Sequence, residues 1–195
     1  MTYAAAFVIL AALAFVLARR KRSPSASAVN GWRINWSRGL PPAPNPQGAG
    51  WAIDVPAGAS LHYVQRYGGS LREGQALTLR LRVTGAFVAS EYPGKPASAT
   101  IMLQRKGDNG SAAGVFETYR QFSGAMIPLT EGEHSLSVTL NAQSFGGIMG
   151  SHDPAAFKAV LTNLESIGVV FGAAGGRGHG VQAPSGGRVE LLSLA

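Results

Sequence analysis

Few residues in this sequence have the types and spacing that catalysis requires. Hydrolysis of a glycosidic bond needs two carboxylates held about 5 to 10 Å apart, whereas the ten acidic residues are scattered singly or fall in expected turns. We therefore interpret the acidic residues as solvated charges and, at Asp153, as a helix cap. The chain has no cysteine and no GxSxG motif, which excludes a thiol nucleophile and the usual serine elbow. The sequence predicts that the chain is not an enzyme.

Metal binding has equally little support in the sequence. Two imidazoles need HExxH or HxH spacing to share one ion, and the four histidines lie far apart. No oxygen-rich loop of the kind that calcium needs is evident. We predict neither a metal site nor a cofactor.

The side chains best suited to binding are aromatic rings, arginines and amides on the polar faces of expected strands. Aromatic rings stack on the apolar faces of sugar rings, and planar polar groups reach the hydroxyls. Strand alternation places these candidates on polar faces: Tyr63, Tyr67, Arg80, Arg82, Gln104, Tyr119 and Gln121. An alternative is that the tyrosines close the edge of the core and the arginines form an ordinary solvated face.

A glycine-rich stretch near the C-terminus could also approach a ligand. Residues 172–180 contain five glycines, with Arg177 and His179 between them. Such a backbone exposes its N–H groups, and Arg177 and His179 would be the polar contacts. The alternative is a wide, flexible connection between two strands, and the absence of a following Lys-Ser or Lys-Thr excludes a phosphate loop.

Short strands must position these side chains. Apolar residues alternate with polar ones most clearly from Leu77 to Val83, the period of a half-buried strand. We expect Trp32, Trp36 and Trp51 in the core and a helix over 153–164, with Asp153 as N-cap and Pro154 first. The proline-rich stretch 40–50 is expected to be a loop. The other strands are expected at 32–36, 51–55, 61–67, 100–106, 115–122, 134–140, 167–171 and 188–194.

This order of elements predicts a mostly β chain, a two-sheet antiparallel jelly-roll sandwich with one short helix. The closing segments, 164–172 (LESIGVVFG), the glycine-rich 173–180 and 187–194 (GRVELLSL), resemble jelly-roll carbohydrate-binding modules and the galactose-binding-like superfamily. The resemblance covers about 31–195. It implies a β-sandwich and sugar binding as an expectation.

The N-terminus reads as a membrane anchor. Residues 3–18 are all apolar or aromatic and would form a helix of about 24 Å, and Arg19, Arg20, Lys21 and Arg22 follow at once. These four residues suit anionic lipid headgroups. We therefore expect a single transmembrane helix with its basic stop over 1–22, a linker over 23–30 and the sandwich domain over 31–195.

The basic cluster also bears on the side of the membrane. The positive-inside rule places the domain in the cytoplasm. A small-x-small pattern at 25–28 (SASA) leaves open a cleaved signal peptide and a periplasmic or extracellular domain, and a buried core helix is a third reading of the apolar run.

The formal net charge of +7 includes the four basic residues after the apolar run, which leaves 7 − 4 = +3 elsewhere. Nucleic-acid binding is therefore not expected. Two main hypotheses remain for the domain: a non-catalytic module that binds a glycan or another polar polymer, or a structural protein that assembles with itself or a partner, as in a membrane-containing virion or envelope complex. A third, hydrolysis, would require two carboxylates to converge in a cleft. Exposure of Tyr63, Tyr67 and Tyr119 together would favour binding, and burial would favour assembly.

Overall fold

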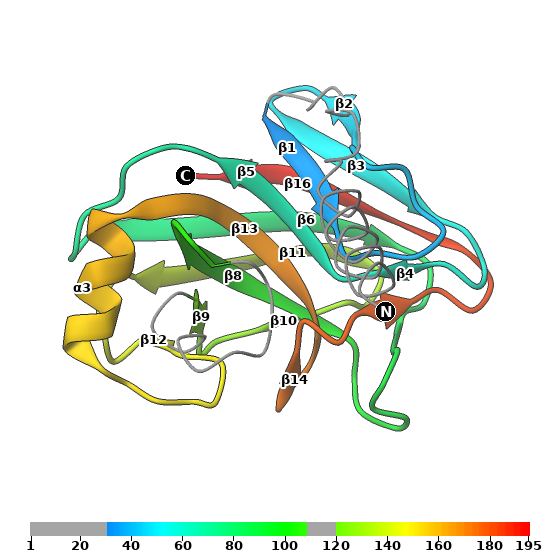
Figure 1. The fold of residues 1–195 in the computed structure, drawn as a ribbon. Helices are drawn as coiled ribbons and strands as arrows, with labels where there is room; N and C mark the ends of the chain where they lie inside the picture. The colour runs from blue at the N-terminus through cyan, green and yellow to red at the C-terminus, as the bar shows by residue number, and fades with distance from the viewer. Residues whose placement is uncertain (1–30, 109–119) are drawn as a thin grey trace, which may run out of the picture.

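The computed structural model describes residues 31–108 and 120–195, and these form two antiparallel sheets packed face to face (Figure 1). Every strand pairing among them is antiparallel. The expected two-sheet antiparallel sandwich is confirmed. The expected membrane span 3–18, its basic stop 19–22 and Tyr119 lie outside the described residues. In the part of the chain that is described, no helix has the length and apolarity needed to cross a bilayer.

The larger sheet has eight strands, six in one continuous order and two short ones, β10 and β14, paired with the ends of its inner strands. In spatial order its main strands are β1 (Trp32–Asn35), β5 (Tyr63–Tyr67), β13 (Leu164–Ala173), β8 (Ser98–Arg105), β9 (Arg120–Ser123) and β12 (Phe145–Gly146). The two short strands are β10 (Ile127–Pro128), paired with β8, and β14 (Gly176–Arg177), paired with β13.

The second sheet has five strands, and a small third sheet has three. The five are β11 (Gly132–Thr139), β6 (Ala76–Thr84), β16 (Gly187–Leu194), β3 (Gly50–Val55) and β2 (Asn45–Gln47). The three are β4 (Ser60–Leu61), β15 (Val181–Gln182) and β7 (Val88–Ala89).

The core lies between the two large sheets and follows from strand alternation. On β6 the apolar residues Leu77, Leu79, Leu81 and Val83 are buried while their neighbours face outward, as a period of two requires. Side chains of β5, β8 and β13 join them in one apolar cluster. The fold is therefore held by the inner faces of both sheets.

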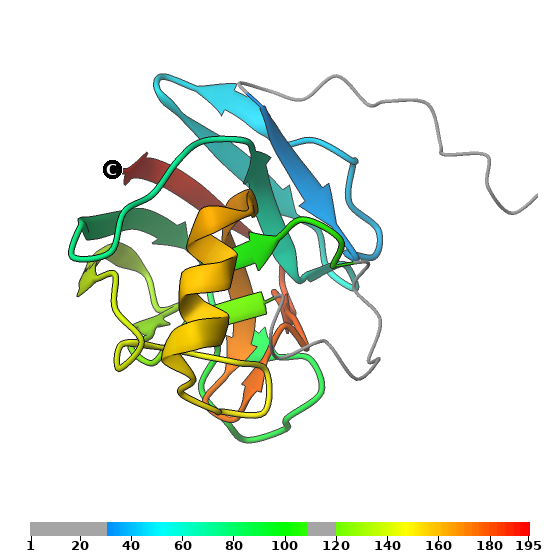
Figure 2. The same ribbon diagram turned by 60° about the vertical axis from the view of Figure 1, so that its left-hand side comes forward.

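One helix, α3 (Pro154–Thr162), lies at one end of the sandwich (Figures 1 and 2). Asp153 is its N-cap, as predicted, and accepts hydrogen bonds from the backbone N–H groups of Ala155 and Ala156. Phe157 points into the core and packs on Phe145, with 5.8 Å between ring centroids. The helix thus closes the open end between the sheets.

Two stretches expected to be loops contain strand. The proline-rich segment 40–50 includes β2, which pairs with β3 at the sheet edge, a position where a proline costs no ladder hydrogen bond. The glycine-rich segment folds as a hairpin, because Gly172 and Ala173 of β13 pair with Arg177 and Gly176 of β14. The wide, flexible connection considered from sequence is therefore wrong for this hairpin.

Candidate functional site

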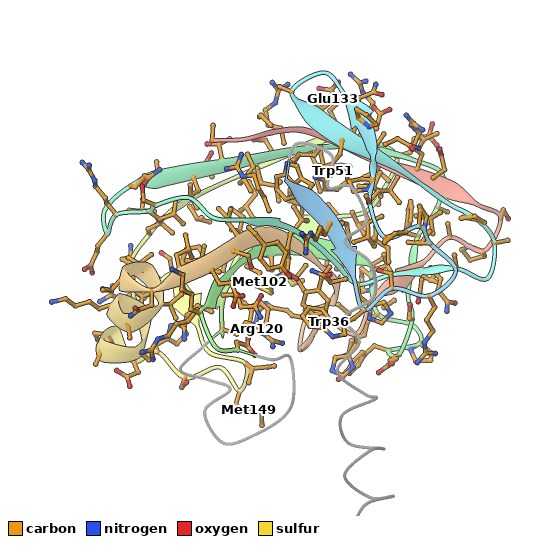
Figure 3. All side chains as sticks on the ribbon, turned by 45° about the horizontal axis from the view of Figure 1, so that its top comes forward. Trp36, Trp51, Met102, Arg120, Glu133 and Met149 are labelled. Atoms are coloured by element: carbon orange, nitrogen blue, oxygen red, sulfur yellow. The ribbon has the colours of Figure 1, made fainter. Side chains whose placement is uncertain are left out.

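The surface of the eight-stranded sheet that faces away from the second sheet, here called the outer face, carries the candidate site. Val64, Ile101 and Val169 point into the core, so the residues that alternate with them point outward. Tyr63, Tyr67 and Gln104 all lie on this outer face by register. Figure 3 shows Trp36, Met102 and Arg120 on this side, with Glu133 on the opposite side of the molecule.

Amide and hydroxyl side chains cross the outer face from strand to strand. Asn35 Nδ2 donates to Gln65 Oε1 at 2.7 Å, and Gln65 Nε2 donates to Gln104 Oε1 at 2.6 Å and to Ser166 Oγ at 2.8 Å. Ser166 Oγ donates to Gln104 Oε1 at 3.1 Å. We call Asn35, Gln65, Gln104 and Ser166 the amide cluster. Because Gln65, Gln104 and Ser166 are buried, each hydrogen bond also satisfies a polar group that water does not reach.

Glycine at position 168 makes room for this cluster. Gly168 lies on β13 between Gln65 on β5 and Met102 on β8. A Cβ atom there would lie 2.6 Å from the backbone oxygen of Val64 and 2.9 Å from Cγ of Gln65. The side chain of Gln65 can therefore cross β13 to reach Gln104 only because position 168 has no side chain.

Trp36 lies on the outer face, not in the core where the alternation of Trp32, Ile34 and Trp36 predicts it. Strand β1 ends at Asn35, and Trp36 has φ 55°, whereas Trp32 stays buried at 2% exposure. A positive φ is rare for a bulky residue and marks a strained position. This backbone turn places the centre of the Trp36 ring 4.9 Å from that of the Tyr63 ring, edge to face, and leaves Trp36 48% exposed.

A buried ion pair lies beneath the aromatic pair. Arg120 donates from Nε and Nη2 to the two carboxylate oxygens of Asp108, at 2.6 and 2.7 Å, and its guanidinium carbon is 5.7 Å from the centre of the Trp36 ring. The interpretation of every acidic residue as a solvated charge or cap is therefore wrong for Asp108, whose side chain is almost fully buried. A two-point Arg–carboxylate contact fixes the plane of the guanidinium and thereby the surface on which Trp36 rests.

The phenol groups at this face differ in their surroundings. Burial raises the pKa of Tyr63, and the nearby Arg120 guanidinium acts in the opposite direction. Tyr63 is therefore a neutral hydroxyl at ordinary pH. Tyr67 is 40% exposed, accepts a hydrogen bond from Asn35 Nδ2 at 3.1 Å, and lies under the Arg33 guanidinium at 5.2 Å. With Tyr63 buried and Tyr67 exposed, the proposed test by tyrosine exposure decides for neither hypothesis.

Other sequence candidates lie elsewhere. Arg80 and Arg82 are on the outward face of the second sheet, where both contact Glu133 and Arg82 also contacts Glu190. Glu133 raises the pKa of Arg82, so these arginines already have counter-ions. Gln121 pairs with Leu103 on the core side of β9 and is buried. Its assignment to a polar face is wrong, because Arg120 and Phe122 are the residues of β9 that face outward.

His179 and Arg177 extend from the β14 hairpin in different surroundings. His179 Nδ1 lies 2.6 Å from a carboxylate oxygen of Glu91, and its ring packs edge to face on Tyr92. Arg177 Nη2 donates to the backbone oxygen of Gly124 at 3.2 Å. Within the described residues, no group of three or more His, Asp or Glu side chains could hold a metal ion.

A buried serine and histidine pair supports the hairpin. His62 Nδ1 is 3.0 Å from the carbonyl oxygen of Gly178, so Nδ1 carries the proton and Nε2 accepts from Ser60 Oγ at 3.1 Å. Burial lowers the pKa of His62. Both side chains are buried, so the pair anchors the hairpin and does not present a nucleophile at the surface.

Sequence reasoning missed Trp36, Asn35, Gln65, Asp108 and Arg120. Gln65 could have been found, because it shares a strand face with Tyr63 and Tyr67. Arg120 could not be placed without the register of β9 against β8. Nothing in the sequence around Trp36 signals a left-handed backbone at that residue.

Comparisons with known proteins show similarity to solved structures in fold, and none in sequence family. No protein-family model matches the chain, and no curated protein matches it in sequence. A solved structure titled xylan-binding module CBM15 has a TM-score of 0.38 and 13% identity, covering 87% of this chain and 96% of that one.

Two further solved structures were found. The N-terminal cellulose-binding domain of β-1,4-glucanase C from Cellulomonas fimi has a TM-score of 0.37 and 15% identity, covering 85% of this chain and 88% of that one. A mutant of Xylanase10C from Cellvibrio japonicus in complex with xylopentaose has a TM-score of 0.35 and 14% identity, covering 86% of this chain but 28% of that one. Two of the titles name carbohydrate-binding modules, the class that the sequence resembles. Likeness at these TM-scores carries no argument about ligand or site, so the case for function rests on the outer face itself.

Proposed function

We propose that the domain is a non-catalytic glycan-binding module whose ligand lies on the outer face, along β1 and β5. The observation that carries this proposal is Trp36. Its strained backbone turns a large ring out of the core and onto a polar sheet face, where it is half exposed. Strained backbone conformations of this kind cluster at functional sites.

The neighbours of Trp36 suit a ligand that has both apolar faces and hydroxyls. Trp36 and Tyr67 offer exposed rings on which sugar rings can stack. Asn35 lies between them and is only partly buried, and it presents a planar amide that is held by hydrogen bonds to Gln65 and Tyr67. Sites that combine apolar walls with a few fixed polar groups are typical of ligand recognition.

The spacing of the rings favours an oligosaccharide over a single sugar. Tyr63, on which Trp36 packs, and Tyr67 are four residues apart on β5, about 13 Å along an extended strand. A chain of several sugar units could contact both ends at once. We therefore infer that the ligand is a polymer or an oligomer.

The membrane tether is a further part of the proposal, and it rests on the sequence alone. Residues 3–18 with Arg19 to Arg22 support a single N-terminal span. The positive-inside rule favours a cytoplasmic domain, with a periplasmic or extracellular domain as the alternative. Recovery of the full-length chain in membranes after an alkaline wash, and its release when residues 3–18 are deleted, would support the tether.

The binding proposal is tested by screening the full-length chain against a panel of immobilised polysaccharides, with Trp36→Ala and Arg72→Gln variants beside it. Arg72 is exposed and lies outside the outer face, so its variant is a control for surface changes. We expect retention on at least one polysaccharide by the parent and by Arg72→Gln, and its loss in Trp36→Ala. Equal retention of all three proteins, or of none, would contradict the proposal.

A further inference from the structure

Arg177 extends the row of outward side chains on β5. Tyr63 pairs with Val170, and two residues further along β13 Gly172 pairs with Arg177. Directly opposed residues of paired strands point to the same face, so Arg177 occupies the next outward position after Tyr63, about 7 Å along the strand direction. The row on the outer face therefore reads Tyr67, Gln65, Tyr63 and Arg177.

Contact with the hairpin confirms that Arg177 lies beside Tyr63. Gly178, the next residue, approaches the Tyr63 hydroxyl so closely that a Cβ atom there would overlap it. The carbonyl of Gly178 is held by the imidazole of His62 at 3.0 Å. Both contacts fix the hairpin, and hence the origin of the Arg177 side chain, against the end of β5.

Arg177 is partly buried and, within the part of the chain that the structure describes, forms no ion pair. Arg80, Arg82, Arg120 and Arg188 each contact a carboxylate. Among residues 31–108 and 120–195, no carboxylate lies within ion-pair distance of Arg177, and Glu91 pairs with His179 of the same hairpin.

The guanidinium of Arg177 also has donors to spare. Among the described residues it donates one hydrogen bond, from Nη2 to the Gly124 carbonyl, and its buried Nε finds no acceptor there. Burial lowers the pKa of Arg177. A partly desolvated charge without a counter-ion is costly, and a planar guanidinium matches a carboxylate in two-point geometry.

We propose that the glycan bound by the outer face is acidic, and that Arg177 binds the carboxylate of a uronic acid while the rings of Trp36 and Tyr67 contact the sugars. The inference rests on the proposed function, because it names the charge of the ligand at the same face. The position of Arg177 at the end of the row fits a ligand carboxylate beyond the sugar nearest Tyr63. Neutral glycans would leave this charge unmatched.

The test uses pairs of polysaccharides that differ only in charge. Polygalacturonate, alginate and a glucuronic-acid-substituted xylan are each compared with the same polymer after reduction of its carboxyl groups to alcohols. Affinities are measured for the full-length parent, Arg177→Gln, Arg177→Lys, Trp36→Ala and the control Arg72→Gln, and thermal unfolding confirms that each variant is folded.

For at least one pair, we expect the parent to bind the acidic form tighter than the reduced form. Arg177→Gln should weaken binding of the acidic form about ten- to hundredfold, the range for a hydrogen bond to a charged group, and leave the reduced form unchanged. Arg177→Lys should fall between, since it keeps the charge but loses the fork, and Arg72→Gln should match the parent.

Two results would overturn the inference and leave the proposed function standing: equal binding of both forms that depends on Trp36, or a preference for the acidic form that survives Arg177→Gln. Absence of binding to every acidic and reduced polymer, and to the panel of neutral polysaccharides, would overturn the proposed function and the inference with it.

Discussion

Gln65 and Gln104 should depend on each other energetically, because the amide cluster acts as one unit. The cluster is joined by a 2.6 Å hydrogen bond between their side chains, and both also bond Ser166 Oγ. Replacing Gln65 by leucine removes three hydrogen bonds, each with a net value of about 0.5–1.5 kcal/mol, which gives a loss of about 1.5–4.5 kcal/mol before any gain from the more apolar side chain. That gain makes the single variant hard to interpret.

A double-mutant cycle removes this difficulty, because the transfer terms of Gln65→Leu and Gln104→Leu cancel. We expect a coupling free energy of about 1 kcal/mol or more between the two, within the range for residues of one hydrogen-bond network. The measurement is the free energy of unfolding in urea for the parent, both single variants and the double variant. Gln75→Leu, at the exposed start of the second sheet, should be additive with Gln65→Leu. Additivity of Gln65→Leu with Gln104→Leu would refute the description of the cluster as a connected network.

Two further predictions concern the hairpin. Gly178→Ala and Gly94→Ala both place a side chain at positive φ, 84° and 81°. Among the described residues, the new side chain meets the Tyr63 hydroxyl at position 178 and nothing within 4 Å at position 94. Gly178→Ala should therefore lower the free energy of unfolding by about 1–3 kcal/mol more than Gly94→Ala, and equal losses would show that the contact is not needed. The pKa of His62 is lowered by burial and opposed by the Gly178 carbonyl and Glu91, so the unfolded state binds the proton more readily. The stability contributed by the neutral imidazole is thus present above about pH 6.5, and it is lost as the pH falls through the lower folded-state pKa of His62. Urea titrations from pH 8 to 5 should show a smaller loss of unfolding free energy in His62→Gln than in the parent. Identical pH profiles for the two proteins would contradict this.

Most of the architecture could be predicted from the alternation of apolar and polar residues, because alternation is a local property of each strand. Leu77 to Val83 fills the inner face of β6 as its period of two requires, and Asp153 and Pro154 start the one described helix. The strands in segments 40–50 and 172–180 were missed because of their composition. Prolines at an edge strand and glycines in a tight hairpin lower strand propensity without preventing pairing.

The candidate site was less predictable, because it depends on register and on one backbone angle. Tyr63, Tyr67 and Gln104 were placed on the correct sheet face because their strands alternate regularly. Gln121 was placed on the wrong face, since one residue of shift on β9 exchanges its two faces. Trp36 was wrongly assigned to the core. The residue types continue the alternation of β1 through position 36, but the φ of 55° at Trp36 breaks it.

The central claim, that Trp36 contacts a glycan on the outer face, is tested most directly by tryptophan fluorescence. Trp36 is half exposed, whereas Trp32 and Trp51 are buried, so a bound saccharide should change the emission of Trp36 alone. With a polysaccharide retained in the binding screen, we predict a saturable blue shift in the parent protein and in Arg72→Gln, and no shift in Trp36→Phe. Retention of the polysaccharide without any change in emission, or an equal shift in Trp36→Phe, would contradict the account.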